Sequence, residues 1–326
     1  MALINTRVVG SKNGPKEEDI PPGIAYATAT NLDRCSINDG IFAKHLEQTH
    51  SKHPDVPLPL HTVCIKASNL KWVKKGEQVK NFNAKMKDLF YATVCEAQCR
   101  TADRDQKLYD PMLKLYHGCP LMINSNFDVQ NCIANGTMCK FEGIILKDGV
   151  AINDLEKICI DGFYVRCASV SQIHSIKLKL IDGLTHPEEE RSVELSPKSK
   201  TVTCSIPISL DGEVHRNTYR EKRKLKLEQF PVNVSHARTI HKLQGRSLDN
   251  IFISSWDYRD NWIYVALSRV KTLRGLFLRM PLDHKKCKPM PFAVRDFMEK
   301  MRSKQPPTPV ELPDEKRARL RYQYHD

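Results

Sequence analysis

Two stretches decide the fold of this chain: FPVNVSHARTIHKLQGRSLDNIFIS at residues 230–254 and NWIYVALSRVKTLRGLFLR at residues 261–279. Runs of β-forming residues alternate here with runs that have helical spacing. The pattern predicts strands at 232–237, 248–255 and 275–280, separated by helices at 238–245 and 261–270. Strands and helices that alternate over so short a length favour a parallel sheet with flanking helices.

Polar side chains are concentrated in two short motifs of this region, TIHKLQG at 239–245 and YVALSR at 264–269. Thr239 begins the first helix, where its hydroxyl and the free backbone N–H groups suit a phosphate, although a plain capping role is equally compatible. Gly245 can end this helix without steric cost. The same helix carries hydrogen-bond donors at helical spacing: His241, Lys242 and Gln244. The alternative is a solvated helix face with one buried histidine.

The N-terminal part of the chain begins with another strand and helix. Residues 24–30, IAYATAT, contain enough alternating β-forming residues for a strand. The residues from 31 onward place Ile37, Phe42 and Leu46 at helical spacing, and Asn or Asp residues are available as caps. A strand followed by a helix is the start of an α/β unit.

The middle of the chain has a different pattern. Residues 140–229 contain short β-rich runs separated by turn-forming stretches such as HPEEE and SPKSK. This spacing predicts a small antiparallel barrel or sheet instead of further α/β units. Asn126 precedes it, as does the turn ANGT at 134–137, in which the Asn-Gly pair is more typical of a hairpin turn than of a contact site.

Composition narrows the class of partner. Lysine and arginine outnumber the acidic residues by 51 to 38 among 326 residues, which gives a net charge of +13. Such a charge favours a polyanion such as nucleic acid, although a soluble basic protein without that partner is the alternative. The eleven cysteines complete no zinc site and are typical of buried thiols in a reducing compartment. No stretch is apolar enough for a membrane span or a signal peptide.

The two quoted stretches resemble the last two conserved motifs of Pif-type and RecD-like superfamily-one DNA helicases, and look most like the eukaryotic, Helitron-associated branch. YATATNLDRCSINDGIFAKHL at 26–46 is similar to the strand and helix that open the second RecA-like domain of these enzymes. LYHGCPLMINSNFDVQNCIANGTMCKFEGI at 115–144 is similar to the stretch that leads into an inserted small barrel. These blocks cover a little under half of the chain.

The resemblance implies an ATP-dependent enzyme that translocates on single-stranded DNA, with ATP and magnesium bound between two RecA-like domains. Arg269, which we place in the second helix, would be an arginine finger that stabilises charge on the transferred γ-phosphoryl group. A surface arginine paired with a carboxylate is the alternative for it. Gln244 and Gly245 would also face ATP. The residues implied to contact DNA are Thr239, His241, Lys242 and Asn126.

The chain departs from this family in one respect. It contains no GxxxxGK[ST] loop to cradle the nucleotide phosphates, and ahead of residue 20 no Asp-Glu pair follows an apolar strand to hold magnesium. We therefore expect the C-terminal half of a helicase, inactive alone, whose first RecA-like domain could be supplied in trans. An ATP-independent single-stranded nucleic-acid-binding module and a non-functional mobile-element remnant are the alternatives.

The expected organisation is a second RecA-like domain, of α/β class, interrupted by a small antiparallel β-barrel. Its expected parts are a linker or remnant at 1–20, the first part of the RecA-like domain at 21–139, the barrel at 140–229, the second part at 230–300 and a disordered tail at 301–326. We expect the protein in the nucleus or in another intracellular compartment that contains DNA.

Overall fold

The computed structural model describes residues 2–49, 61–73, 109–131, 133–181, 191–207, 220–259 and 261–287, together with residues 295, 296 and 299. The chain divides into two compact units, and the first comprises Met1–Asp257 with Asn261–Leu282. The second comprises Tyr258–Asp260 with Asp283–Asp326, and its described residues include the short 3-10 helix η6 (His284–Lys286). The tail that we predicted to be disordered, 301–326, lies outside the described residues.

A parallel sheet of short strands forms the α/β part of the first unit. Its strand order is β14–β1–β15–β16, and all neighbours in it run parallel. The bounds are Ala25–Thr28 (β1), Ala237–Thr239 (β14), Ile251–Ile253 (β15) and Leu276–Leu278 (β16). β1, β15 and β16 fall within the predicted ranges. Since all these strands pair in parallel, the predicted α/β class with a parallel sheet is confirmed.

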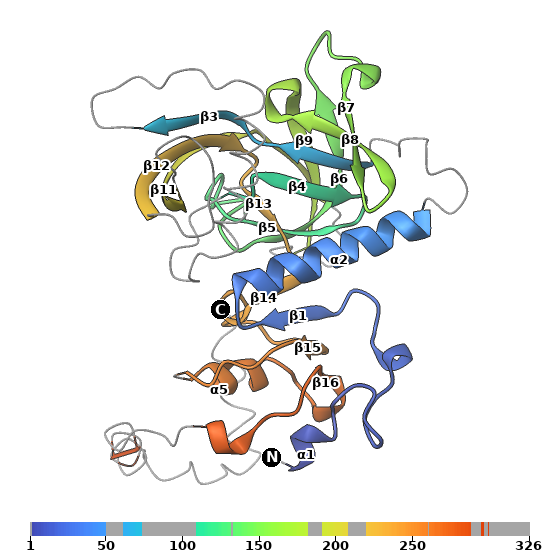
Figure 1. Ribbon diagram of the computed structural model, residues 1–326, viewed down its shortest axis with the longest axis vertical. Coiled ribbons are helices and arrows are strands. Elements are labelled where there is room, and N and C mark those ends of the chain that lie inside the picture. The colour runs from blue at the N-terminus through green and yellow to red at the C-terminus, as the bar shows by residue number, and fades with distance from the viewer. Residues whose placement is uncertain are drawn as a thin grey trace, which may run out of the picture. The chain divides into compact units, whose positions relative to one another are not determined.

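Helix α2 (Asn31–Thr49) follows β1, as predicted, and lies between the parallel sheet and the strand β4 of the β-rich part (Figure 1). Its buried side includes Phe42 and Leu46, two of the three apolar residues that define its predicted face. Ile37 is only partly buried, and Asn38 is buried beside it instead. The helix therefore presents a mixed polar and apolar side to the sheet.

Hydrogen bonds explain why a polar residue can be buried on α2. Asn38 Oδ1 accepts a hydrogen bond from Ala237 N at 2.8 Å, and Asn38 Nδ2 donates to Val234 O at 3.2 Å. A buried amide that finds such partners avoids the cost of desolvation. At the start of the helix the capping group comes from Thr30, whose Oγ1 accepts a hydrogen bond from Asp33 N at 3.1 Å.

The predicted strand at 232–237 is two strands that belong to different sheets. β13 (Val232–Val234) pairs antiparallel with β5 (Pro120–Ile123), whereas β14 pairs parallel with β1. The chain crosses from one sheet to the other at residues 235–236. The helix that follows, α4 (Ile240–Leu243), is correspondingly shorter than the predicted range of 238–245.

Helix α5 (Trp262–Leu267) is also shorter than predicted. It buries Trp262 and Ala266 and ends with Ser268 as its C-terminal cap. Arg269 consequently lies in the turn beyond the helix, so the prediction that placed this arginine within a helix is wrong.

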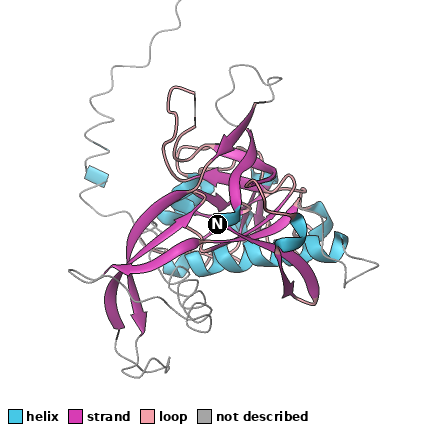
Figure 2. Cartoon of the chain, turned by 90° about the horizontal axis from the view of Figure 1, so that it is seen from above, coloured by secondary structure: helices cyan, strands magenta, loops and turns pink. Residues whose placement is uncertain are grey.

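The β-rich part consists of sheets that are largely antiparallel, and Figure 2 shows its long, curved strands beside the helices. The strand orders are β10–β9–β6–β5–β13, β4–β2–β8–β7 and β11–β12–β3, with β2 and β8 running parallel. The remaining bounds are Thr62–Lys66 (β2), Ser68–Val73 (β3), Met112–Tyr116 (β4), Met138–Leu146 (β6), Glu156–Ile160 (β7), Phe163–Ser169 (β8), Ile173–Leu180 (β9), Ser192–Leu195 (β10), Lys198–Pro207 (β11) and Arg220–Gln229 (β12).

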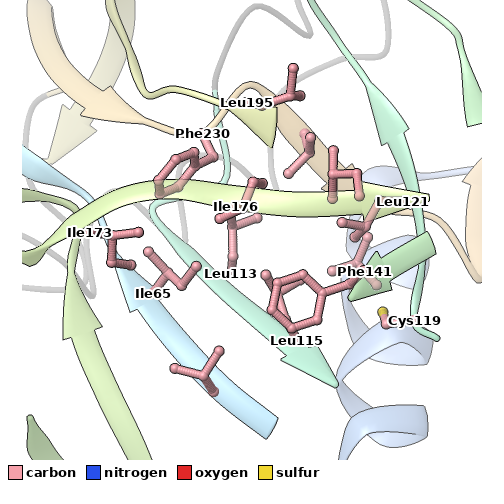
Figure 3. Close-up of a cluster of buried hydrophobic side chains, with 14 of the residues drawn as sticks. Ile65, Leu113, Leu115, Cys119, Leu121, Phe141, Ile173, Ile176, Leu195 and Phe230 are labelled. Atoms are coloured by element: carbon pink, nitrogen blue, oxygen red, sulfur yellow. The ribbon is translucent and has the colours of Figure 1, made fainter. Parts of the chain in front are cut away.

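One apolar core lies among these strands. Phe141 and Phe230 are fully buried there, together with aliphatic side chains such as Ile65, Leu113 and Ile176 (Figure 3). Each such side chain stabilises the fold by about 1.5–3 kcal/mol relative to an exposed position. The core draws on strands from β2 to β13, so it ties sequence-distant segments together.

The described strands form open sheets, so the predicted closed barrel is not confirmed. Two strands that flank residues 140–229 in the sequence, β5 and β13, share a sheet with β6 and β9. The boundaries at 140 and 229 remain a prediction.

Short helical turns and the N-terminal segment complete the first unit. The turns are α1 (Ala2–Asn5), η1 (Glu17–Asp19), η3 (Ile152–Asp154), η4 (Val170–Gln172) and η5 (Leu273–Gly275). Residues near the N-terminus extend along β16, because Val9 N donates to Leu278 O at 2.9 Å and Leu278 N donates to Arg7 O at 3.0 Å. Within the described ranges, no helix is both long and apolar enough to cross a membrane.

Candidate functional site

The turns that follow α4 and α5 lie side by side and bring the two polar motifs together. Leu248 N donates a hydrogen bond to Arg269 O at 2.7 Å, and Lys271 N donates to Leu248 O at 3.0 Å. Together they make a parallel bridge between Leu248 and Val270. The Arg246 carbonyl adds a third link, because it accepts a hydrogen bond from Arg269 Nη1 at 3.2 Å. The segment directly after TIHKLQG thus helps to hold the end of YVALSR.

The Arg269 side chain is half-buried and is held by neutral acceptors. Its Nε donates to Val265 O at 3.0 Å, and its Nη2 donates to Ser268 Oγ at 2.9 Å, in addition to the bond with Arg246 O. Among the described residues, no carboxylate forms an ion pair with this guanidinium. Its positive charge is therefore positioned but not neutralised by these contacts.

This arrangement fits a phosphoryl group. A guanidinium has five N–H donors, and the three hydrogen bonds of Arg269 leave one N–H on each terminal nitrogen for phosphate oxygens. A planar, permanently charged side chain held by backbone carbonyls is suited to an arginine finger. The described residues hold no group of three or more His, Cys, Asp or Glu side chains placed to bind a metal ion.

Thr239 occupies a less accessible position than the other predicted site residues. It is the last residue of β14 and the N-terminal cap position of α4, but its hydroxyl makes no capping hydrogen bond. The side chain is only 1% exposed, and its Oγ1 finds no hydrogen-bond partner in the described structure. A strand phosphate would reach this hydroxyl only after a local opening, so its role in DNA binding remains a prediction.

The other polar residues of TIHKLQG reach solvent, whereas Ile240 and Leu243 are fully buried. His241 and Gln244 are exposed, and Lys242 is half-buried on the same short helix. Gly245 has φ of +83°, in the left-handed region that favours glycine, directly after the C-terminal cap Gln244. The prediction that Gly245 ends the helix is confirmed, whereas the contacts of these residues with ATP or DNA stay predictions.

Asn126 is exposed and organises the loop ahead of β6. Its Oδ1 accepts a hydrogen bond from Asn135 N at 2.9 Å, and its carbonyl accepts one from Lys198 Nζ at 3.0 Å. The Asn-Gly pair forms a turn in which Gly136 has φ of +101°. These contacts give Asn126 a structural role, and contact with DNA is a further prediction for it.

Arg246 is a residue that sequence reasoning missed. Its Nη2 donates a hydrogen bond to Gly136 O at 2.7 Å, while its own carbonyl accepts the bond from Arg269. It therefore joins the Asn-Gly turn, the TIHKLQG motif and the arginine of YVALSR. Its position immediately after Gly245 was the available signal, since the residue after a left-handed glycine leaves the helix in a new direction.

His236 lies where the chain crosses between the two sheets and is the buried member of a stack of three rings. Its ring is stacked with Tyr116, and its Nε2 lies 2.7 Å from the Tyr116 hydroxyl. His45 of α2 stacks on Tyr116 with ring centroids 3.9 Å apart. Burial lowers the pKa of His236 to about 4, so its ring is neutral at pH 7 and can accept the tyrosine hydrogen bond.

Comparison with known proteins finds relatives that match this chain over only part of their own length. No protein-family model matches the chain. It is 23% identical over 299 residues to the uncharacterized protein 030L of Invertebrate iridescent virus 6, a match that covers 80% of this chain and 54% of that protein. Over 53 residues it is 43% identical to the ATP-dependent DNA helicase Pif1 of Bdellovibrio bacteriovorus, which covers 16% of this chain and 12% of the helicase.

Solved structures that are similar to this chain include Pif1 helicases. The Pif1 helicase of Candida albicans has a TM-score of 0.48 at 19% identity, covering 86% of this chain and 50% of the helicase. The Bacteroides Pif1 bound to single-stranded DNA has a TM-score of 0.47 at 18% identity, covering 93% of this chain and 49% of that helicase. The chain thus spans about half the length of the viral relative and of these helicases.

Proposed function

We propose that this chain forms the second RecA-like domain of an ATP-dependent DNA helicase, the part that grips single-stranded DNA and contributes an arginine to the ATP site. The observation that carries the proposal is the link between the two motifs: Arg269 donates to the carbonyl of Arg246, directly after TIHKLQG. The short match to a bacterial Pif1 helicase supports it. The finer assignment to the eukaryotic, Helitron-associated branch stays a prediction.

On the nucleotide side, Arg269 would face ATP that is bound by another RecA-like domain, in the same polypeptide or in another chain. The magnesium-bound nucleotide brings a γ-phosphoryl group on which negative charge spreads during transfer. Arg269 would donate its two remaining N–H groups to this charge, while the Val265 and Arg246 carbonyls hold the guanidinium in place. Gln244 and Gly245, exposed at the end of α4, would border the same nucleotide.

On the DNA side, the exposed His241 and the half-buried Lys242 would contact the strand backbone. Thr239 would join them after a local opening, and Asn126 would contact the strand from the loop ahead of β6. The β-rich part, with proposed boundaries at 140 and 229, would help to hold the strand. Such an activity belongs in the nucleus or another compartment that contains DNA.

Equilibrium binding tests the DNA part of this proposal with the purified chain. We expect fluorescence anisotropy to show that the chain binds a labelled single-stranded oligonucleotide and that its affinity falls steeply as the salt concentration rises. The net charge of +13 is the reason, because lysine and arginine side chains that contact phosphates release counterions from DNA. Lys242→Ala should reduce the slope of log K against log salt by about 0.7, the value for one phosphate contact on a single strand.

The matched control is Lys12→Ala, which removes one exposed lysine from the N-terminal segment, outside both TIHKLQG and residues 140–229. This variant should bind like the wild type. If both lysine substitutions reduce the salt slope equally, the binding depends on overall charge, and a specific role for TIHKLQG is contradicted.

A further inference from the structure

A large cavity lies beside the parallel sheet, and its lining includes Arg246 and Leu248 of the turn that holds Arg269. Its volume is about 1090 Å³, slightly above the range of about 300–1,000 Å³ that is common for ligand sites. The walls come from the N-terminal segment near Gly23, from α2, from β1, β14 and β15, and from β5 and β6 of the β-rich part. The cavity therefore lies between the α/β part and the β-rich part of the first unit.

The charge of this cavity is strongly positive. Its cationic lining residues are Lys44, Lys140, Arg238, Arg246 and Arg279. Glu17 is the acidic member of the described lining. His236, which also borders the cavity, adds no charge at pH 7 because burial holds its pKa near 4. Such an excess of positive charge is complementary to a polyanion.

The cavity also offers aromatic surface for flat ligands. Tyr26 of β1 and Phe252 of β15 are both half-buried in its lining, and their ring centroids are 5.1 Å apart. Ile37 and Ile41 of α2 add apolar surface. Ile37 is the residue that the helical pattern assigned to the core, and its place in the cavity explains why it is only partly buried.

We propose that this cavity binds a segment of single-stranded nucleic acid, with unstacked bases against Tyr26 and Phe252 and phosphates near the lysine and arginine side chains. Aromatic rings beside a positively charged track are the combination that single-strand-binding proteins use, because every base has a face that can stack. A duplex keeps its bases stacked inside and could not use the aromatic surface. The proposal deepens the proposed function, since it rests on the strand being the partner.

Binding measurements with the full chain test this site. We expect the double variant Lys140→Ala with Arg279→Ala, which removes two exposed cations, to lower the salt slope for single-stranded DNA by about 1.4, corresponding to two phosphates. Tyr26→Leu should weaken binding by about tenfold through lost stacking, whereas Tyr26→Phe should bind like the wild type. Thermal melting monitored by circular dichroism establishes that each variant is folded.

The matched control is Lys12→Ala with Lys285→Ala, which removes the same charge from exposed positions outside the cavity lining and outside residues 140–229. A photoreactive 5-iodouracil oligonucleotide should cross-link to Tyr26 or Phe252 in the wild type. If the wild type binds but the cavity variants match the control pair and cross-links map elsewhere, the cavity site is overturned and the proposed function stands. If the wild type fails to bind single-stranded DNA, both are overturned.

Discussion

Gly245 determines how the chain leaves α4 towards Arg246. Its φ of +83° costs an L-residue conformational strain, although a Cβ atom there would meet nothing within 4 Å. We therefore expect Gly245→Ala to lower the free energy of unfolding by about 1 kcal/mol, through backbone strain and not through a clash. Urea denaturation followed by circular dichroism measures this change.

Gly40 provides the opposite control. It lies inside α2, where an added Cβ atom would also meet nothing within 4 Å, but its backbone is not left-handed. Gly40→Ala should raise the free energy of unfolding by roughly 0.5–1 kcal/mol, because alanine favours a helix. Stabilisation by both substitutions would show that Gly245 is not held in the left-handed conformation.

At the level of elements, Gln229 fastens several strands of the β-rich part at once. Its buried Nε2 donates to Ile65 O at 3.2 Å and to Asp110 O at 3.1 Å, and its Oε1 accepts from Phe230 N at 2.9 Å. Gln229→Leu should reduce the free energy of unfolding by roughly 2–4 kcal/mol, because buried backbone groups would lose their partners. Chemical denaturation checks this value.

An exposed glutamine on a helix serves as the comparison. Gln48 is exposed near the end of α2, so Gln48→Leu should change the free energy of unfolding by less than about 0.5 kcal/mol. Similar effects from both substitutions would contradict the structural role assigned to Gln229.

The elements also show what a sequence can and cannot predict. β1, β15 and β16 are predictable because their β-forming runs are short, apolar and bounded by turns. The division of 232–237 into β13 and β14 is not, because it depends on Asn38 of α2 hydrogen bonding to Ala237 from far away in the sequence. Beyond the early end of α5 the chain likewise makes a contact with a distant segment, the bridge between Leu248 and Val270.

The candidate site was predictable to a similar extent. The two motifs are dense enough in polar residues to be recognised, and Gly245 ends its helix as its type suggests. The burial of Thr239 and the bridging role of Arg246 were not predictable, because each depends on which segments pack beside the motif in three dimensions. Local pattern gives no information on such long-range contacts.

At the scale of the whole molecule, the surface around Arg269 is open. His241 and Gln244 are exposed, and the aromatic ring of Tyr264 on α5 is 73% exposed. An exposed large aromatic side chain on the helix that leads to Arg269 suits a surface that another domain covers. This openness agrees with the proposed ATP site, which a first RecA-like domain would complete.

ATP hydrolysis by a fusion of this chain to a first RecA-like domain from a Pif1 helicase tests the central claim most directly. We predict that the chain alone hydrolyses no ATP, that the fusion hydrolyses ATP when single-stranded DNA is added, and that Arg269→Ala lowers its kcat roughly a thousandfold. Arg274→Ala, at an exposed arginine in η5, should leave kcat near the wild-type value. A fusion in which Arg269→Ala hydrolyses ATP as fast as the wild type would contradict the role proposed for this domain.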